Sequence, residues 1–125
     1  MKIIKTLLYI AIGGAIGSVL RYFLSIMINK YWANNFPLAT FVTNVLGCFL
    51  IGLFVGILEK YYLSSSALKY LLITGFCGGF TTFSAFAFEN FTLFQNQNTL
   101  IALLYIGTSI FMGIISVWLG LFISK

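Results

Sequence analysis

Residues 69–91 read KYLLITGFCGGFTTFSAFAFENF, and this stretch decides the fold. It is long and apolar enough to cross the hydrocarbon core of a bilayer, which takes about 20 helical residues. Its centre nevertheless holds three glycines, two adjacent threonines and a serine between Gly75 and Ser84. Glycine is poor in helix interiors and threonine hydroxyls compete for backbone carbonyls, so this composition predicts a helix broken within the membrane. Broken backbone at that depth must be covered by protein or line a cavity.

The rest of the 125-residue chain shares the apolar character of this stretch. Hydrophobic residues make up 61% of the chain and charged residues 7%, against roughly 25% charged residues in soluble domains. A soluble protein of this size has too little interior to hide so much apolar surface from water. We therefore predict an all-α integral membrane protein, one domain over residues 1–125, with four transmembrane helices and a broken third helix. The predicted spans are residues 6–28, 38–58, 69–91 and 100–123.

The titratable side chains argue against several functions. The chain has no histidine, and Glu59 and Glu89 are its only acidic residues. General acid–base catalysis therefore has almost no groups to use, and an enzyme is not expected. The net charge of +5 does not indicate nucleic-acid binding, because the cations are dispersed near the span ends and form no basic patch. Cys48 and Cys77 lie in apolar spans and form no C-x-x-C motif, as expected of small buried side chains.

Lysine placement favours one orientation in the membrane. With four spans, both termini and the connector between the second and third spans share one side. That side carries most of the lysines, whereas the other side has Lys30 and, closer to the membrane, Arg21. Because basic residues are enriched on the cytoplasmic side of membrane proteins, this excess predicts that both termini are cytoplasmic. The lysines expected on the cytoplasmic side are Lys2, Lys5, Lys60, Lys69 and Lys125.

The glycines indicate close helix packing. All twelve glycines lie inside the predicted spans, where small residues let helix backbones approach each other. Gly13-x-x-x-Gly17 and Gly52-x-x-x-Gly56 are two such pairs. This pattern implies a compact bundle or a dimer, and by itself no specific activity.

Two spans carry a polar stripe along one helical face. The stripe of the second span consists of Thr40, Thr43, Asn44 and Gly47. The stripe of the fourth span consists of Tyr105, Thr108, Ser109, Met112 and Ser116. Neither stripe holds an acid, and both offer the O–H or N–H donors that an anion needs in place of water. The stripes therefore indicate an anion pathway, although Ser and Thr hydroxyls also bond to the preceding helical turn or to a neighbouring helix.

Three further residues allow two interpretations each. Arg21 lies about two turns from the end of the first span and is either a snorkelling anchor or a fixed positive charge at an aqueous vestibule. Phe83 and Phe86 are three residues apart and share one face if a helix resumes there. They are either packing residues or a source of positive ring edges that face an anion.

Together these residues resemble the small fluoride channel family known as Fluc or CrcB. The motif in the third span, from Gly75 to Ser84, is highly specific. The other matching pieces are Gly13-Gly14-x-x-Gly17 followed by Arg21-Tyr22, and Pro37-x-x-Thr40-x-x-x-Asn44-x-x-Gly47. Length and four-span layout agree as well, so the resemblance covers nearly the whole chain. Two departures are Ala39, where a glycine is expected, and Ala85, where a threonine is common.

The resemblance implies a fluoride-selective channel, multi-pass in the bacterial inner membrane, that passively exports fluoride and so reduces its toxicity. It also implies an antiparallel, dual-topology dimer with two pores, each lined by both subunits. Phe83 and Phe86 would supply ring edges, and Asn44 would donate to the ion. A structural sodium ion, not transported, would sit at the dimer centre on the backbone carbonyls of Gly78 and Thr81. The other residues expected along the pathway are Thr40, Tyr105, Ser109 and Arg21.

Some alternatives stay open at this point. The lysine excess conflicts with an antiparallel homodimer, so the chain either inserts both ways, which we favour, or pairs with an oppositely oriented homologue. A small multidrug exporter also has four spans and an antiparallel dimer, but it needs an embedded carboxylate, for which Glu89 is the only candidate. A non-conducting assembly subunit would use the glycines for packing alone.

Overall fold

The computed structural model describes residues 2–125, and all regular structure in that range is helical. Three helices are continuous: α1 (Lys2–Tyr31), α2 (Leu38–Lys60) and α6 (Thr99–Ser124). The third span is assembled from α3 (Ala67–Lys69), η1 (Tyr70–Cys77), α4 (Gly78–Phe80) and α5 (Phe83–Gln95). Four helices are long and apolar enough to cross a membrane. The prediction of an all-α protein with four transmembrane helices is confirmed.

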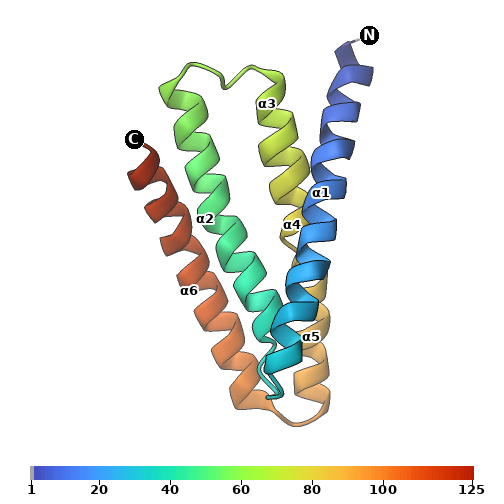
Figure 1. The fold of residues 1–125 in the computed structure, drawn as a ribbon. Helices are drawn as coiled ribbons and strands as arrows, with labels where there is room; N and C mark the ends of the chain where they lie inside the picture. The colour runs from blue at the N-terminus through green and yellow to red at the C-terminus, as the bar shows by residue number, and fades with distance from the viewer. Residues whose placement is uncertain (1) are drawn as a thin grey trace.

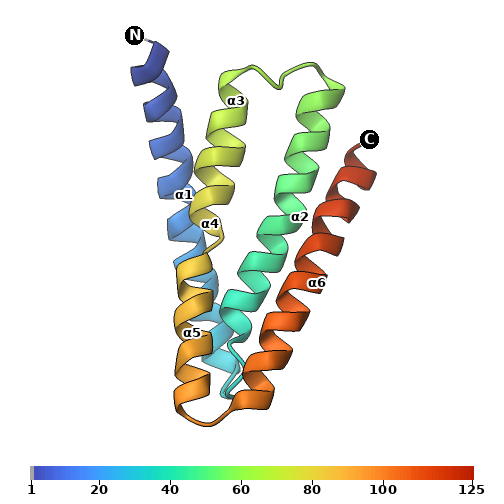
Figure 2. The same cartoon turned by 180° about the vertical axis from the view of Figure 1, so that it is seen from behind.

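The four spans form two pairs (Figures 1 and 2). α1 runs along the third span, and α2 runs along α6. The pairs meet at the end that carries the connectors 32–37 and 96–98, and they spread apart at the other end. Both termini and the connector 61–66 lie at the spread end, so the lysines predicted to share one side lie at the same end of the bundle.

Glycines bring the helices of each pair into backbone contact. A Cβ atom added to Gly13 or Gly17 of α1 would collide with backbone carbonyl oxygens of the third span. A Cβ atom on Gly52 of α2 or Gly120 of α6 would collide in the same way with the other helix of that pair. The predicted role of the Gly-x-x-x-Gly pairs in tight packing is therefore confirmed, and the contacts lie within one chain.

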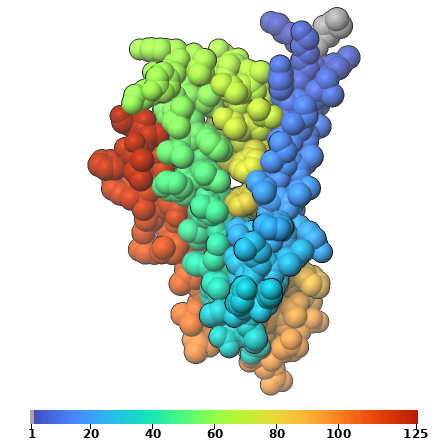
Figure 3. All heavy atoms as spheres, viewed as in Figure 1, coloured from blue at the N-terminus to red at the C-terminus, as the bar shows by residue number. Residues whose placement is uncertain are grey.

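The buried core sits at the end where the two pairs meet. Leu93 of α5 packs with Ala102 and Tyr105 of α6, and the aromatic rings of Phe36, Phe41 and Phe86 surround this cluster. Elsewhere the large apolar side chains mostly point outward, such as Val19 on α1 and Phe111 on α6. The space-filling view in Figure 3 shows the outer surface of the bundle on the side where α1, α2 and α6 are seen. Such a surface is suited to lipid rather than to water.

The third span departs from a regular helix before it breaks. η1 is a π-helical stretch, in which each turn is wider than an α-helical turn. Gly75 within η1 faces α1, where a Cβ atom would lie 2.7 Å from the carbonyl oxygen of Ile10. The wide turn and the glycine together bring the third span close to α1 just ahead of the break.

Candidate functional site

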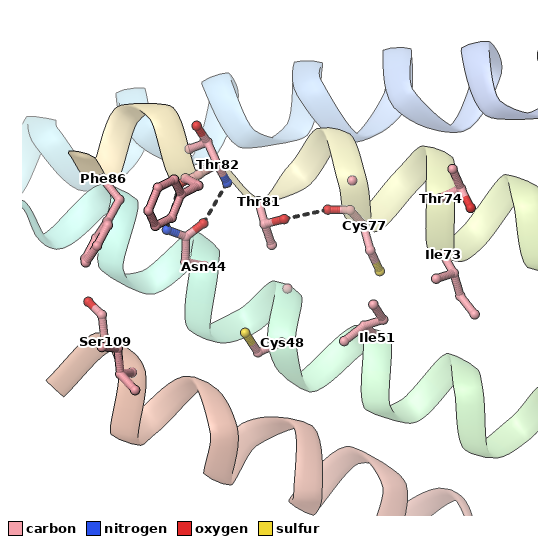
Figure 4. Close-up of a pocket in the computed structure, with 14 residues that line it drawn as sticks. Asn44, Cys48, Ile51, Ile73, Thr74, Cys77, Thr81, Thr82, Phe86 and Ser109 are labelled. Carbon is pink, nitrogen blue, oxygen red and sulfur yellow. Dashed lines mark hydrogen bonds between the residues drawn. The ribbon is translucent and has the colours of Figure 1, made fainter. Parts of the chain in front are cut away.

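The third span is interrupted at Thr81 and Thr82, as the sequence predicts. α4 ends at Phe80, both threonines have extended backbone, and α5 begins at Phe83. The amide group of Asn44 on α2 holds this interruption in place (Figure 4). The backbone N–H of Thr82 donates to Asn44 Oδ1 at 2.8 Å, and Asn44 Nδ2 donates to the Thr82 carbonyl at 3.1 Å. One side chain thus replaces both backbone partners of Thr82.

The interruption also frees the two carbonyls that the family resemblance implies as sodium ligands. In an unbroken helix, the N–H groups of Thr82 and Ala85 would donate to the carbonyls of Gly78 and Thr81. Here the Thr82 N–H turns to Asn44, and the Ala85 N–H donates to Thr82 Oγ1 at 3.1 Å, which caps α5. Freed carbonyls of a broken transmembrane helix are the kind of ligand that holds Na⁺. Gly78 and Thr81 therefore fit the chemistry of such an ion.

Arg21 reaches the interruption from α1. Its Nε donates to the Gly79 carbonyl at 3.0 Å, and the side chain is half-buried. That carbonyl would otherwise lose its helical partner, because α4 ends one residue later. Arg21 therefore stabilises the break from α1, as Asn44 does from α2, and places a positive charge beside it.

A cavity of about 470 Å³ adjoins the interruption, between α2, the third span and α6. One part of its wall is polar or aromatic, with Asn44, Thr82, Phe86 and Ser109. The other part is lined by Ile51, Ile73 and the free thiols of Cys48 and Cys77. Figure 4 shows these residues converging from three spans on one space. Neither cysteine was expected at a functional site, since both match small apolar side chains.

Phe83 and Phe86 lie on the first turn of α5 and both line this cavity. Their ring centroids are 5.8 Å apart, with the ring planes tilted by 39°. The Phe86 ring meets the Tyr105 ring edge to face at 4.9 Å, which fixes its orientation. The Phe83 side chain is 78% exposed on the surface of the single chain. Since the two rings contact each other, the prediction that they share one face is confirmed.

Three predicted pathway residues come from α2 and α6 and lie deeper in the bundle. Thr40 Oγ1 donates to Glu89 Oε2 at 2.7 Å, and the Tyr105 hydroxyl donates to Glu89 Oε1 at 2.9 Å. The Ser109 hydroxyl is buried without a hydrogen-bond partner among the described residues, and it points into the cavity in Figure 4. An unpaired buried hydroxyl is costly, so Ser109 has a donor to offer whatever enters the cavity.

Glu89 places an acidic side chain between the two polar stripes. The stripes of the second and fourth spans contain none, but α5 brings the Glu89 carboxylate between them, where Thr40 and Tyr105 hold both its oxygens. From the sequence, Glu89 was a candidate only for the embedded carboxylate of an exporter. Its hydrogen bonds could not be predicted, because the residues that donate to it lie 49 and 16 positions away in the chain. The available signal was the carboxylate itself, since an ionisable residue inside a span is by default a functional candidate.

Comparisons with known proteins agree on one family. Residues 8–121 match the family described as CrcB-like protein, Camphor Resistance (CrcB). A protein of Flavobacterium psychrophilum named "Fluoride-specific ion channel FluC" is 58% identical over 121 residues, which cover 97% of this chain and 98% of the relative. Proteins of the same name from Azobacteroides pseudotrichonymphae and Rhizobium etli are 45% and 42% identical, over 98% and 94% of both chains.

Proposed function

Since the chain belongs to the CrcB-like family, whose relatives above are named fluoride-specific ion channels, we propose that it is a fluoride channel and not an enzyme. The observation that carries this proposal is the cavity at the helix break. It joins amide and hydroxyl donors to a pair of phenyl rings inside a membrane bundle.

Fluoride entering such a cavity must exchange its water for other donors. Asn44 has two amide protons and uses one on Thr82, so one remains for the ion. Ser109 adds an unpaired hydroxyl. The positive edges of Phe83 and Phe86 supplement these donors where the wall is apolar. The pathway would thus recognise a small anion with neutral groups.

Thr40 and Tyr105 extend this pathway beyond the rings. Each hydroxyl has one proton and gives it to Glu89, so neither can donate to an anion at the same time. Fluoride passing this point would compete with the carboxylate for those protons. Movement of Glu89 would then accompany passage of the ion.

A second, inverted copy of the chain would close the pathway. One chain leaves Phe83 and Gly78 on an exposed face, although both line the cavity. Four helices barely enclose a polar pathway, whereas eight around an interface can do so. We favour an antiparallel homodimer with two pores, and an oppositely oriented homologue is the alternative partner. A sodium ion on the Gly78 and Thr81 carbonyls of both copies would bind at their interface and add a fixed positive charge.

Fluoride would leave the cell passively by this route. An inside-negative potential favours outward movement of an anion by about 2.3 kcal/mol per 100 mV. The four apolar helices make the chain a multi-pass membrane protein. Its proposed location is the bacterial inner membrane, where efflux would lower fluoride toxicity.

The test is fluoride efflux from proteoliposomes. Vesicles loaded with potassium fluoride should release fluoride rapidly when a potassium ionophore is added, and vesicles loaded with potassium chloride should release almost no chloride. Equal release of the two halides, or no release from protein of verified helicity, would refute the proposal.

Phenylalanine variants separate a channel from a non-conducting assembly subunit. Phe83→Ile and Phe86→Ile should abolish most fluoride flux in a channel, whereas in a packing subunit they should lower stability only. Phe122→Ile is the matched control, because Phe122 is exposed near the far end of α6 and does not line the cavity. Wild-type flux from both cavity variants would favour the subunit.

A further inference from the structure

A second cavity, of about 530 Å³, lies between the first two turns of α1 and the beginning of the third span. Its wall includes Lys2, Lys5, Tyr9 and Tyr70, and it shares no lining residue with the cavity at the helix break. Figures 1 and 2 show that the start of α1 extends past α3 and leans away from it. We refer to this feature as the α1–α3 groove.

The α1–α3 groove lies at the depth of lipid headgroups. α1 has 30 residues and is therefore about 45 Å long, against about 30 Å for the hydrocarbon core. Its ends must project into the polar layer of the bilayer. Tyr9 and Tyr70 mark the lower part of the groove, and tyrosines gather at the boundary between acyl chains and headgroups.

The upper part of the groove has positive charge without a counter-charge. Lys2 and Lys5 are three residues apart on α1, so their ammonium groups are neighbours on one helical face and repel each other. Both are exposed, and none of the described residues that line the groove is acidic. An anion between the two lysines would relieve this repulsion.

Apolar ring surface continues the groove below the lysines. Tyr9 lies one turn beyond Lys5 on the same face of α1, and Tyr9 and Tyr70 are each 37% exposed on the wall of the groove. A free phosphate compound or an acidic peptide would leave this apolar surface uncovered, whereas a lipid covers it with acyl chain. The positive charge in the upper part of the groove matches a lipid headgroup, and the apolar surface in its lower part matches the acyl chain of the same lipid.

We propose that the α1–α3 groove binds an anionic phospholipid, with its phosphate between Lys2 and Lys5 and its acyl chain along the rings of Tyr9 and Tyr70. The inference does not depend on fluoride conduction, because it uses none of the residues of the pathway. A dimer with inverted copies would present one such groove to each leaflet.

Native mass spectrometry of the full-length protein tests this proposal. Protein in detergent is mixed with phosphatidylglycerol and phosphatidylcholine of identical acyl chains in equal amounts. The wild-type chain should retain phosphatidylglycerol preferentially. The variant Lys2→Gln/Lys5→Gln should lose affinity by about fivefold for each lysine, since one basic side chain near an anionic lipid contributes about 1 kcal/mol.

Lys60→Gln/Lys125→Gln is the matched control, because it removes the same charge from the same end of the bundle outside the groove. It should leave the lipid preference unchanged. An equal loss of phosphatidylglycerol affinity in both double variants would mean that the lysines attract anionic lipid through net charge alone, and it would overturn the proposal. Equal retention of the two lipids by the wild-type chain would overturn it as well. Displacement of the lipid by soluble glycerol phosphate at the same concentration would assign the groove to free phosphate compounds and overturn it as well.

Discussion

Asn44 has a structural task that its place in a polar stripe does not reveal. Its amide group pairs with both the N–H and the carbonyl of Thr82, where an extended backbone has no helical partner. The stripe predicts a donor that faces an ion, and the cavity contains that donor. The pairing with Thr82 could not be predicted, because it joins residues 38 positions apart.

Asn44→Ala should destabilise the fold and abolish fluoride flux together. The change leaves the N–H and the carbonyl of Thr82 without partners, at about 1–3 kcal/mol for each unpaired group. Unfolding in mixed micelles and fluoride efflux measure the two effects. Asn29→Ala is the control, since Asn29 is exposed and its amide donates only to Ser25 among the described residues. Loss of flux at unchanged stability would contradict the structural role of Asn44.

Tyr105→Phe should lower the free energy of unfolding while the aromatic packing stays intact. The variant keeps the ring against Phe86 and removes the hydroxyl that donates to Glu89. A hydrogen bond to a charged group contributes about 1.5–3 kcal/mol. Tyr62→Phe is the matched control, because Tyr62 is 92% exposed. If Tyr105→Phe and Tyr62→Phe have the same free energy of unfolding, the hydrogen bond from Tyr105 to Glu89 does not stabilise the fold.

At the scale of elements, the sequence predicted the four helices and the broken third one, because length, hydropathy and the Gly/Thr cluster are local signals. The stabilisation of the break was not predictable, since Asn44 and Arg21 reach it from other helices. The π-helical turns of η1 also escaped prediction. Their wide geometry accompanies the packing of Gly75 against α1, which is a tertiary contact.

Gly120→Ala should separate α2 from α6. A Cβ atom at Gly120 would collide with the Phe49 carbonyl and lie 2.6 Å from the Leu53 nitrogen, and backbone atoms yield less easily than side chains. We expect a loss of about 1–3 kcal/mol in unfolding free energy, as for other overpacked sites. Unfolding in mixed micelles provides the measurement.

Gly107→Ala on the same helix is the control for this prediction. Nothing lies within 4 Å of an added Cβ atom there. Alanine is the better helix former by about 1 kcal/mol, so this variant should be as stable as the wild type or more so. Equal destabilisation by both alanines would show that α2 and α6 do not depend on close backbone contact.

At the scale of the whole molecule, charge is distributed unevenly between the two ends. Five lysines belong to the spread end, namely Lys2, Lys5, Lys60, Lys69 and Lys125. The opposite end carries Lys30 among the described residues. This excess favours termini in the cytoplasm, although an antiparallel homodimer needs both orientations.

Labelling of introduced cysteines in intact cells should reveal both orientations. A cysteine at Ser64 reports on the spread end and one at Asn96 on the other, each in a chain with Cys48 and Cys77 replaced by alanine. Lys2→Gln/Lys5→Gln should increase outside labelling of Ser64→Cys, because fewer lysines then hold that end in the cytoplasm. Lys30→Gln should shift the labelling in the opposite direction. If every variant shows a single orientation, the chain cannot form an antiparallel homodimer, and the proposed partner is then an oppositely oriented homologue.

The spreading of the two helix pairs gives each chain the outline of a wedge (Figures 1 and 2). A wedge takes up more area in one leaflet than in the other and so bends the membrane around it. Two wedges pointing the same way would add their curvatures, whereas two pointing opposite ways cancel and fit a flat bilayer. The taper of one chain would therefore favour a head-to-tail arrangement of the two copies in the proposed dimer.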